Sequence, residues 1–164
     1  MKWNVSAPFV FCLLLLGCEK EQPPTRLHEF FKYTIDGEKK LWGQSNALTG
    51  GQFECSFLGD SALFIAVKYG VESIGFYLES HQISNGTYTL DQNNKGFYTS
   101  PKDYQAYRTT SNATGTLTIK KSLFQSYGTV QTLEGHFSFN AVDTIRGKTS
   151  VITDGQFIME CHNY

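Results

Sequence analysis

The chain has little charge, and neither sign is in excess. Of its 164 residues, 18% are charged, with 14 Lys and Arg against 15 Asp and Glu. Because nucleic-acid binding needs a basic surface, this balance argues against nucleic acid as a partner. Proline is scarce as well, at 4 residues, which excludes Pro-rich and collagen-like chains.

Aromatic residues are plentiful instead. The chain has 13 Phe, 9 Tyr and 15 Gly. Many aromatic side chains combined with little charge exclude a disordered chain, because such a sequence can bury enough apolar surface to fold. The length suits a single domain.

Long apolar runs are also missing. The run Phe9–Leu16 is shorter than the about 20 residues that a membrane-spanning helix needs. The run comes after the basic residue Lys2. Its last two residues begin the sequence Leu-Leu-Gly-Cys at residues 15–18, which resembles the lipobox of bacterial lipoproteins. The resemblance implies that residues 1–17 are a signal peptide and that Cys18 carries fatty acids such as palmitate. An ordinary signal peptide with a chance cysteine is the alternative.

A polar stretch with two prolines follows the lipobox. Residues 19–24 read Glu-Lys-Glu-Gln-Pro-Pro, so we predict a lipidated tether over 18–27 and a folded domain over 28–164. Acidic residues after the cysteine also resemble the surface-export signals of Bacteroidetes lipoproteins, with a generic solvated tether as the alternative. The expected location is the bacterial cell envelope, with the lipid anchor in the outer membrane and the domain on its periplasmic or surface face.

The folded region alternates apolar and polar residues almost throughout. This period of two, interrupted by Gly, Asn and Asp, predicts an all-β domain, an antiparallel β-sandwich or barrel of about ten short strands. Tight turns are expected at Asp36-Gly37 and at Asp154-Gly155. On the strand predicted at 129–142, Phe137 and Phe139 share the face that points into the core.

Two cysteines remain in the predicted domain. Cys55 has the parity of its inward neighbours, and so does Cys161, so the two thiols can meet if their strands are adjacent. A disulfide there would close a loop of about 106 residues and contribute roughly 4–5 kcal/mol. Two buried free thiols are the alternative. A zinc site is disfavoured because no Cys-x-x-Cys or His-x-x-x-His spacing occurs, and no metal or cofactor is expected.

The segment 97–108 is the strongest candidate for a binding surface. It places Tyr98, Tyr104, Tyr107 and Arg108 close together, and tyrosine beside a basic residue is common where proteins contact glycans or peptides. The alternative is a strand and loop that cover the end of the core, with the tyrosine hydroxyls reaching solvent.

Catalytic signatures are weak. The chain has no Gly-x-Ser-x-Gly or His-Glu-x-x-His motif, and His136, a candidate base, is more typical of an exposed histidine on a solvent-facing strand. Two triplets, centred on Ser61 and Thr144, resemble the Asp-Ser/Thr-apolar sites that Bacteroidetes glycosylate in exported proteins, although such short motifs also occur by chance.

The mature region resembles a group of Bacteroidetes lipoproteins of unknown function. The matching segments are Phe31-x-x-x-Ile35-Asp36-Gly37 with Trp42, Gly86-Thr87-Tyr88, Gly115 to Ile119, Leu133 to Phe139 and Val151 to Phe157. The resemblance implies an all-β lipoprotein domain and no particular activity. We therefore expect a non-enzymatic envelope lipoprotein that binds a glycan, a peptide or an envelope protein. A structural or assembly accessory is the second hypothesis, and a hydrolase is the third and least favoured.

Overall fold

The computed structural model describes residues 29–43, 51–58, 62–79, 84–126 and 130–163. The predicted signal peptide, the tether, Cys18 and Ser61 lie outside these ranges. Within them every regular element is a strand, which confirms the all-β prediction. The strands are β1 Phe30–Ile35, β2 Glu38–Gly43, β3 Gln52–Leu58, β4 Ala62–Tyr69, β5 Glu72–Glu79, β6 Gly86–Leu90, β7 Lys95–Thr99, β8 Ala106–Arg108, β9 Gly115–Ser126, β10 Val130–Val142 and β11 Thr149–Asn163.

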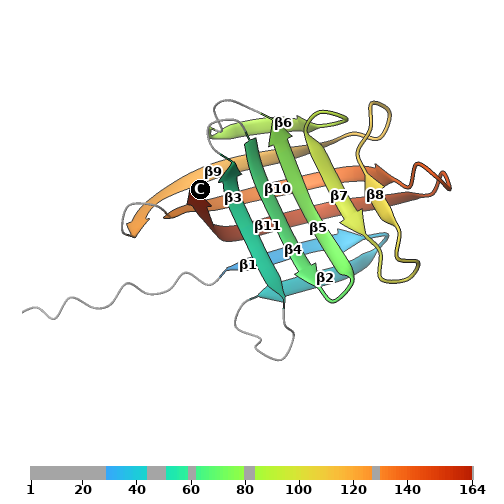
Figure 1. The fold of residues 1–164 in the computed structure, drawn as a ribbon, viewed down its shortest axis with the longest axis horizontal. Helices are drawn as coiled ribbons and strands as arrows, with labels where there is room; N and C mark the ends of the chain where they lie inside the picture. The colour runs from blue at the N-terminus through green and yellow to red at the C-terminus, as the bar shows by residue number, and fades with distance from the viewer. Residues whose placement is uncertain (1–28, 44–50, 59–61, 80–83, 127–129, 164) are drawn as a thin grey trace, which may run out of the picture.

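One continuous sheet curls over itself so that two layers face each other. The sheet order gives one layer as β2-β1-β11-β10-β9-β6 and the other as β3-β4-β5-β7-β8, and Figure 1 shows the strands of the two layers crossing steeply. The layers are joined where β8 meets β10 and where β11 meets β3. Neighbouring strands are antiparallel, except for the short parallel contact between β11 and β3.

A cluster of phenylalanine rings fills the space between the layers. Phe31 and Phe137 come from one layer with ring centroids 5.0 Å apart, and Phe76 comes from the other layer and lies 4.8 Å from Phe137. Phe139 is buried as the strand pattern predicted, at 3% exposure. Because each ring contacts rings on other strands, the cluster holds both layers together.

Glycines lie opposite the phenylalanines on neighbouring strands. A Cβ atom on the glycine would overlap the ring or backbone of its partner in each pair, because the phenylalanine lies against the glycine. The cross-strand pairs are Gly135 with Phe157, Gly155 with Phe137, Gly115 with Phe139 and Gly75 with Phe97. Gly135, Gly155 and Gly115 therefore provide the room in which the rings pack between two closely spaced layers. Gly75 and Phe97 lie on the outer face of their layer, where Phe97 stacks on Phe64.

The predicted turn at Asp36-Gly37 is confirmed, but the one at Asp154-Gly155 is wrong. Asp36 and Gly37 both have positive φ, 48° and 85°, as a two-residue hairpin turn requires. At Asp154, with φ 53°, the register shifts against both neighbouring strands while β11 continues through Thr149–Asn163. This bulge bends one long strand where the sequence alone predicted two short ones.

A disulfide joins Cys55 of β3 to Cys161 of β11, with Cα atoms 4.4 Å apart. The bond lies beside the parallel contact between these strands and connects the two layers at that corner. Its ends are 106 residues apart, so the cross-link restricts the unfolded chain strongly and contributes roughly 4–5 kcal/mol by loop-closure entropy.

We expect Gly135→Ala to destabilise the protein by roughly 1–3 kcal/mol, because the added Cβ meets the Phe157 ring and a strand backbone that cannot yield. Its Cβ would lie 2.5 Å from Cε1 of Phe157 and 2.6 Å from the Thr118 carbonyl oxygen. Denaturant unfolding measures the change. Gly86→Ala is the matched control, because a Cβ there meets nothing within 4 Å. Equal midpoints for the two variants would contradict this account of the core.

Candidate functional site

A cavity of about 560 Å³ opens at one end of the molecule, where three connections meet. These are the Asp36-Gly37 turn, the β7–β8 loop (residues 100–105) and the β10–β11 loop (residues 143–148), which lie at the same end in Figure 1. We call this cavity the mouth. Its lining is Ile35, Asp36, Glu38, Lys40, Tyr98, Ser100, Pro101, Lys102, Asp103, Tyr107, Lys148, Thr149 and Ser150.

The turn of the β1–β2 hairpin is fixed on β11 at the edge of the mouth. The backbone N–H of Asp36 donates to the Val151 carbonyl at 3.0 Å, and the Val151 N–H donates to Oδ1 of Asp36 at 2.8 Å. These bonds hold one wall of the mouth in a single position.

A buried carboxylate lies behind the mouth. Glu72, 6% exposed, accepts hydrogen bonds on Oε1 from the hydroxyls of Tyr33 at 3.0 Å and Tyr98 at 3.3 Å. Its Oε2 faces Nζ of Lys40 at 3.7 Å. A carboxylate buried to this degree requires such partners, so the cluster fixes Tyr98 and Lys40, which both line the mouth.

Burial and the neighbouring carboxylate determine how these tyrosines titrate. Burial is the main cause that raises the pKa of Tyr33, and the charge and hydrogen bond of Glu72 raise it further. The pKa of Tyr98 is raised by the same causes in the same order. Both hydroxyls therefore remain protonated donors well above the pH at which tyrosine ordinarily ionises.

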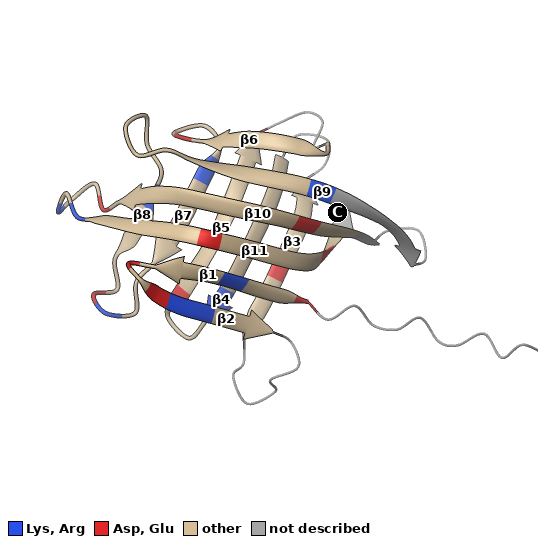
Figure 2. Ribbon diagram, turned by 180° about the vertical axis from the view of Figure 1, so that it is seen from behind, with Lys and Arg blue, Asp and Glu red and all other residues tan. Residues whose placement is uncertain are grey.

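Closer to solvent, acids and bases in the mouth are paired with each other. Lys40 contacts Glu38 at 2.7 Å, and this hydrogen bond and charge lower the pKa of Glu38 and raise that of Lys40. Asp103 accepts the Tyr107 hydroxyl at 2.9 Å and lies 3.8 Å from Nζ of Lys148. Figure 2 shows acidic and basic positions side by side on β2 and on the two loops.

Hydrogen bonds also determine the ionisation of Asp103. Burial alone would raise its pKa, but the hydrogen bonds from Tyr107, Ser100 and the Gln105 backbone, with the charge of Lys148, lower it overall. The mouth consequently presents charges that are already compensated, together with several hydroxyl groups. Such a lining suits a polar ligand that forms hydrogen bonds and carries little net charge.

The four residues of the predicted binding surface separate in the structure. Tyr98 and Tyr107 are buried, at 5% exposure each, and line the mouth with ring centroids 6.1 Å apart. Tyr104 is 70% exposed on the β7–β8 loop, and Arg108 is exposed on β8, and neither lines the mouth. The structure therefore divides the predicted surface into two tyrosines that cover the end of the core and line the mouth, and two exposed side chains outside it. Binding by this segment stays a prediction.

Sequence reasoning missed Glu72, Tyr33 and Lys40, which come from strands that are distant in sequence from the 97–108 segment. One signal was present in the pattern of β5. Glu72 has the same parity as Ile74 and Phe76, which are fully buried, so a charged side chain occupies an inward position. A carboxylate at such a position needs partners, and therefore indicates a polar cluster.

The remaining predicted positions lie away from the mouth. His136 is exposed on β10, and Thr144 is exposed on the β10–β11 loop. Across the described ranges, no group of three or more His, Cys, Asp or Glu side chains is placed to hold a metal ion. The same described residues include no helix long and apolar enough to cross a membrane.

The sequence matches a family over residues 44–159, and the chain belongs to that family, the domain of unknown function DUF6252. The match includes the β7–β8 and β10–β11 loops, while the β1–β2 wall of the mouth precedes it. No curated protein and no solved structure matches the chain significantly.

We expect Tyr33 and Tyr98 to ionise only when the protein unfolds at high pH. Their raised pKa values give stability that is complete below the unfolded-state value of about 10 and is lost as the pH rises above it. Alkaline titration followed by tyrosinate absorbance should therefore show a delayed step that coincides with unfolding. The variant with Tyr33→Phe and Tyr98→Phe should lose amplitude from that step, whereas Tyr104→Phe should not. Early ionisation of all tyrosines in folded protein would contradict the buried cluster.

Proposed function

We propose that the chain is a lipid-anchored protein of the bacterial cell envelope whose β domain binds a polar ligand or partner at the mouth, in a binding role rather than an enzymatic one. The observation that carries the proposal is the mouth itself, a cavity with compensated charges and hydroxyl groups held by a rigid sheet. Cavities at the open end of curled sheets are frequent ligand sites. Neutral glycans and peptides have the matching chemistry.

The direction of β1 supports a mouth that faces away from the proposed lipid anchor. β1 starts at Phe30, next to the tether predicted from the sequence, and ends at Ile35, which lines the mouth. Its six residues span about 20 Å, at roughly 3.3 Å per residue. The mouth is therefore at the far end of β1 from the proposed anchor, where a ligand is accessible while the lipid holds the protein to the membrane.

The alternative, a structural or assembly accessory, depends on strand addition at a free edge of the sheet. In the sheet order the end strands are β2 and β6. β2 carries Lys39 and Lys40, and lysine on an edge strand opposes pairing with another chain. β6, with the sequence GTYTL, has no charge, so it is the edge that favours this second function.

The lipid anchor is tested by labelling cells with a clickable fatty acid. We expect the wild-type protein to be labelled and to fractionate with membranes, and Cys18→Ser to lose both properties, because only the thiol of Cys18 accepts the lipid. Cys12→Ser is the matched control, since Cys12 lies within the predicted signal peptide and its loss should leave labelling unchanged. An unlabelled wild-type band would disprove the anchor.

Ligand binding is tested by thermal unfolding with neutral trisaccharides of glucose and of N-acetylglucosamine and with short uncharged peptides. A ligand that binds only the folded state should raise the melting temperature. Glu38→Gln and Tyr107→Phe, which alter polar groups of the mouth, should reduce that rise. Lys39→Ala is the control, because Lys39 lines a different hollow, with Lys32 and Gln156. Equal shifts in all three variants would exclude the mouth as the site.

A further inference from the structure

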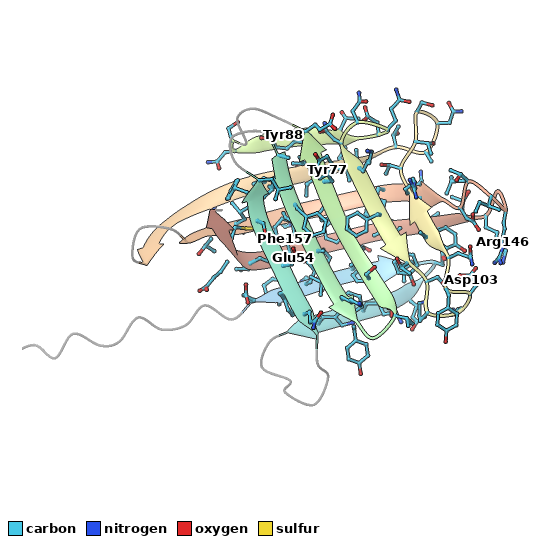
Figure 3. The ribbon with its side chains drawn as sticks, viewed as in Figure 1. Glu54, Tyr77, Tyr88, Asp103, Arg146 and Phe157 are labelled. Carbon is cyan, nitrogen blue, oxygen red and sulfur yellow. A yellow bond between two sulfur atoms is a disulfide. The ribbon has the colours of Figure 1, made fainter. Side chains whose placement is uncertain are left out.

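Each of the two loops beside the mouth presents one large apolar side chain to solvent. Tyr104 of the β7–β8 loop is 70% exposed, and Ile145 of the β10–β11 loop is 87% exposed. Their sequence neighbours Asp103 and Arg146 are 3.9 Å apart, so the loops lie side by side, as Figure 3 shows. Single exposed apolar residues are common on protein surfaces. Tyr104 and Ile145 differ from most of them because hydrogen bonds fix the backbone of each loop.

The backbone of Tyr104 is held in a strained conformation. Its φ of 58° lies in the left-handed region, which is costly for a bulky residue. Two backbone hydrogen bonds maintain it: the Tyr104 N–H donates to the Ser100 carbonyl at 2.9 Å, and the Ser100 N–H donates to the Gln105 carbonyl at 3.0 Å. Backbone strain of this kind persists where the surroundings enforce it, often at binding sites.

Ile145 is held outward by a buried carboxylate. Asp143 is 2% exposed, and its Oδ1 accepts the backbone N–H groups of Ile145 at 2.9 Å and Arg146 at 3.2 Å. The Gly147 N–H donates to the Asp143 carbonyl at 2.8 Å and closes the loop. Both apolar side chains are thus carried on loops with fixed backbones, which lowers the entropy cost of docking against them.

Basic side chains surround the two apolar ones. Lys102, Lys148 and Arg146 have side-chain exposures of 84%, 60% and 47%. Their acidic partners lie 3.8–3.9 Å away, too far for short ion pairs. Arg146 and Lys148 share Asp103, which is only 21% exposed. Lys102 faces Glu38, which is 54% exposed and makes its shorter contact, at 2.7 Å, with Lys40. The two loops themselves thus carry three exposed cations, while their acids, Asp103 and Asp143, are 21% and 2% exposed. Beside the compensated charges of the mouth, the outer surface of the loops therefore has an excess of positive charge around an apolar centre.

We propose that the rim formed by Lys102, Tyr104, Ile145, Arg146 and Lys148 docks a polypeptide partner through an acidic segment that also carries apolar side chains. The inference rests on the proposed binding role and names the class of partner. Of the rim residues, Lys102 and Lys148 lie at the edge of the cavity, and the other three lie outside it. Tyrosine anchored on a rigid loop is a frequent energetic centre of protein interfaces. An anionic membrane surface is less suited, because the rim borders the mouth, which lies at the far end of β1 from the proposed lipid anchor.

The probe is a phage-displayed library of short random peptides, selected on the full mature chain in detergent. We expect the enriched peptides to carry an excess of Asp and Glu together with aromatic or aliphatic residues. Synthetic copies should bind with a Kd that weakens with added salt, as pairing with the rim cations requires. Tyr104→Ser and Ile145→Ser should each weaken that Kd by about ten-fold or more, as truncation of an interface anchor does.

Tyr69→Ser is the matched control, because Tyr69 is also exposed, at 41%, but lies at the end of β4. The Kd of the peptides for this variant should equal their Kd for the wild-type protein.

The proposal is overturned if no peptide is enriched, if the peptides bind both rim variants normally, or if vesicles of phosphatidylglycerol and phosphatidylethanolamine bind in a way that needs Tyr104 and Ile145. The melting-temperature assay of the cavity separates this result from the proposed function. If the rim is right and the cavity is not, peptide binding depends on Tyr104 while the trisaccharides and uncharged peptides cause no shift in melting temperature.

Discussion

The packing of phenylalanine rings against glycine backbones is the interaction on which the rest of the structure depends. The two layers are held by rings from β1, β5, β10 and β11, and the rings of β5, β10 and β11 fit because glycine faces them across a neighbouring strand. The pairs Gly135 with Phe157 and Gly155 with Phe137 lie on the same two strands in opposite order, so β10 and β11 interlock. With the layers fixed in this way, the loops at one end converge on the mouth.

The mouth is also connected to the phenylalanine core through the buried cluster of Glu72, Tyr33 and Tyr98. Where the phenylalanine packing ends, the space between the layers becomes polar, and Glu72 with its two tyrosines occupies it. Tyr33 belongs to both regions, since its ring lies 6.2 Å from Phe31 and its hydroxyl donates to Glu72. A rigid apolar core therefore continues directly into a rigid polar site, and this lets the site keep a defined shape without a ligand.

The sequence was sufficient for the strands and insufficient for the site, for physical reasons. Alternation of apolar and polar residues is a local property, so it predicted all-β structure and the inward face of Phe137 and Phe139. It failed at Asp154-Gly155, because a bulge and a turn use the same residue types and only the neighbouring strands decide between them. The contacts of Glu72 with Tyr33 and Tyr98 span 39 and 26 residues, and no local pattern reports such separations.

The length and position of β11 have a consequence for how the chain matures. This last strand pairs with β1, β10 and β3, and it carries the cysteine that joins Cys55. A ribosome therefore makes β1 to β10 before the two layers have the strand that connects them. Until then β1 lacks its neighbour on one side, and the thiol of Cys55 has no partner. The closed fold therefore forms only after β11 has been made, and a chain that lacks β11 stays open to proteases and to any machinery that handles unfolded protein.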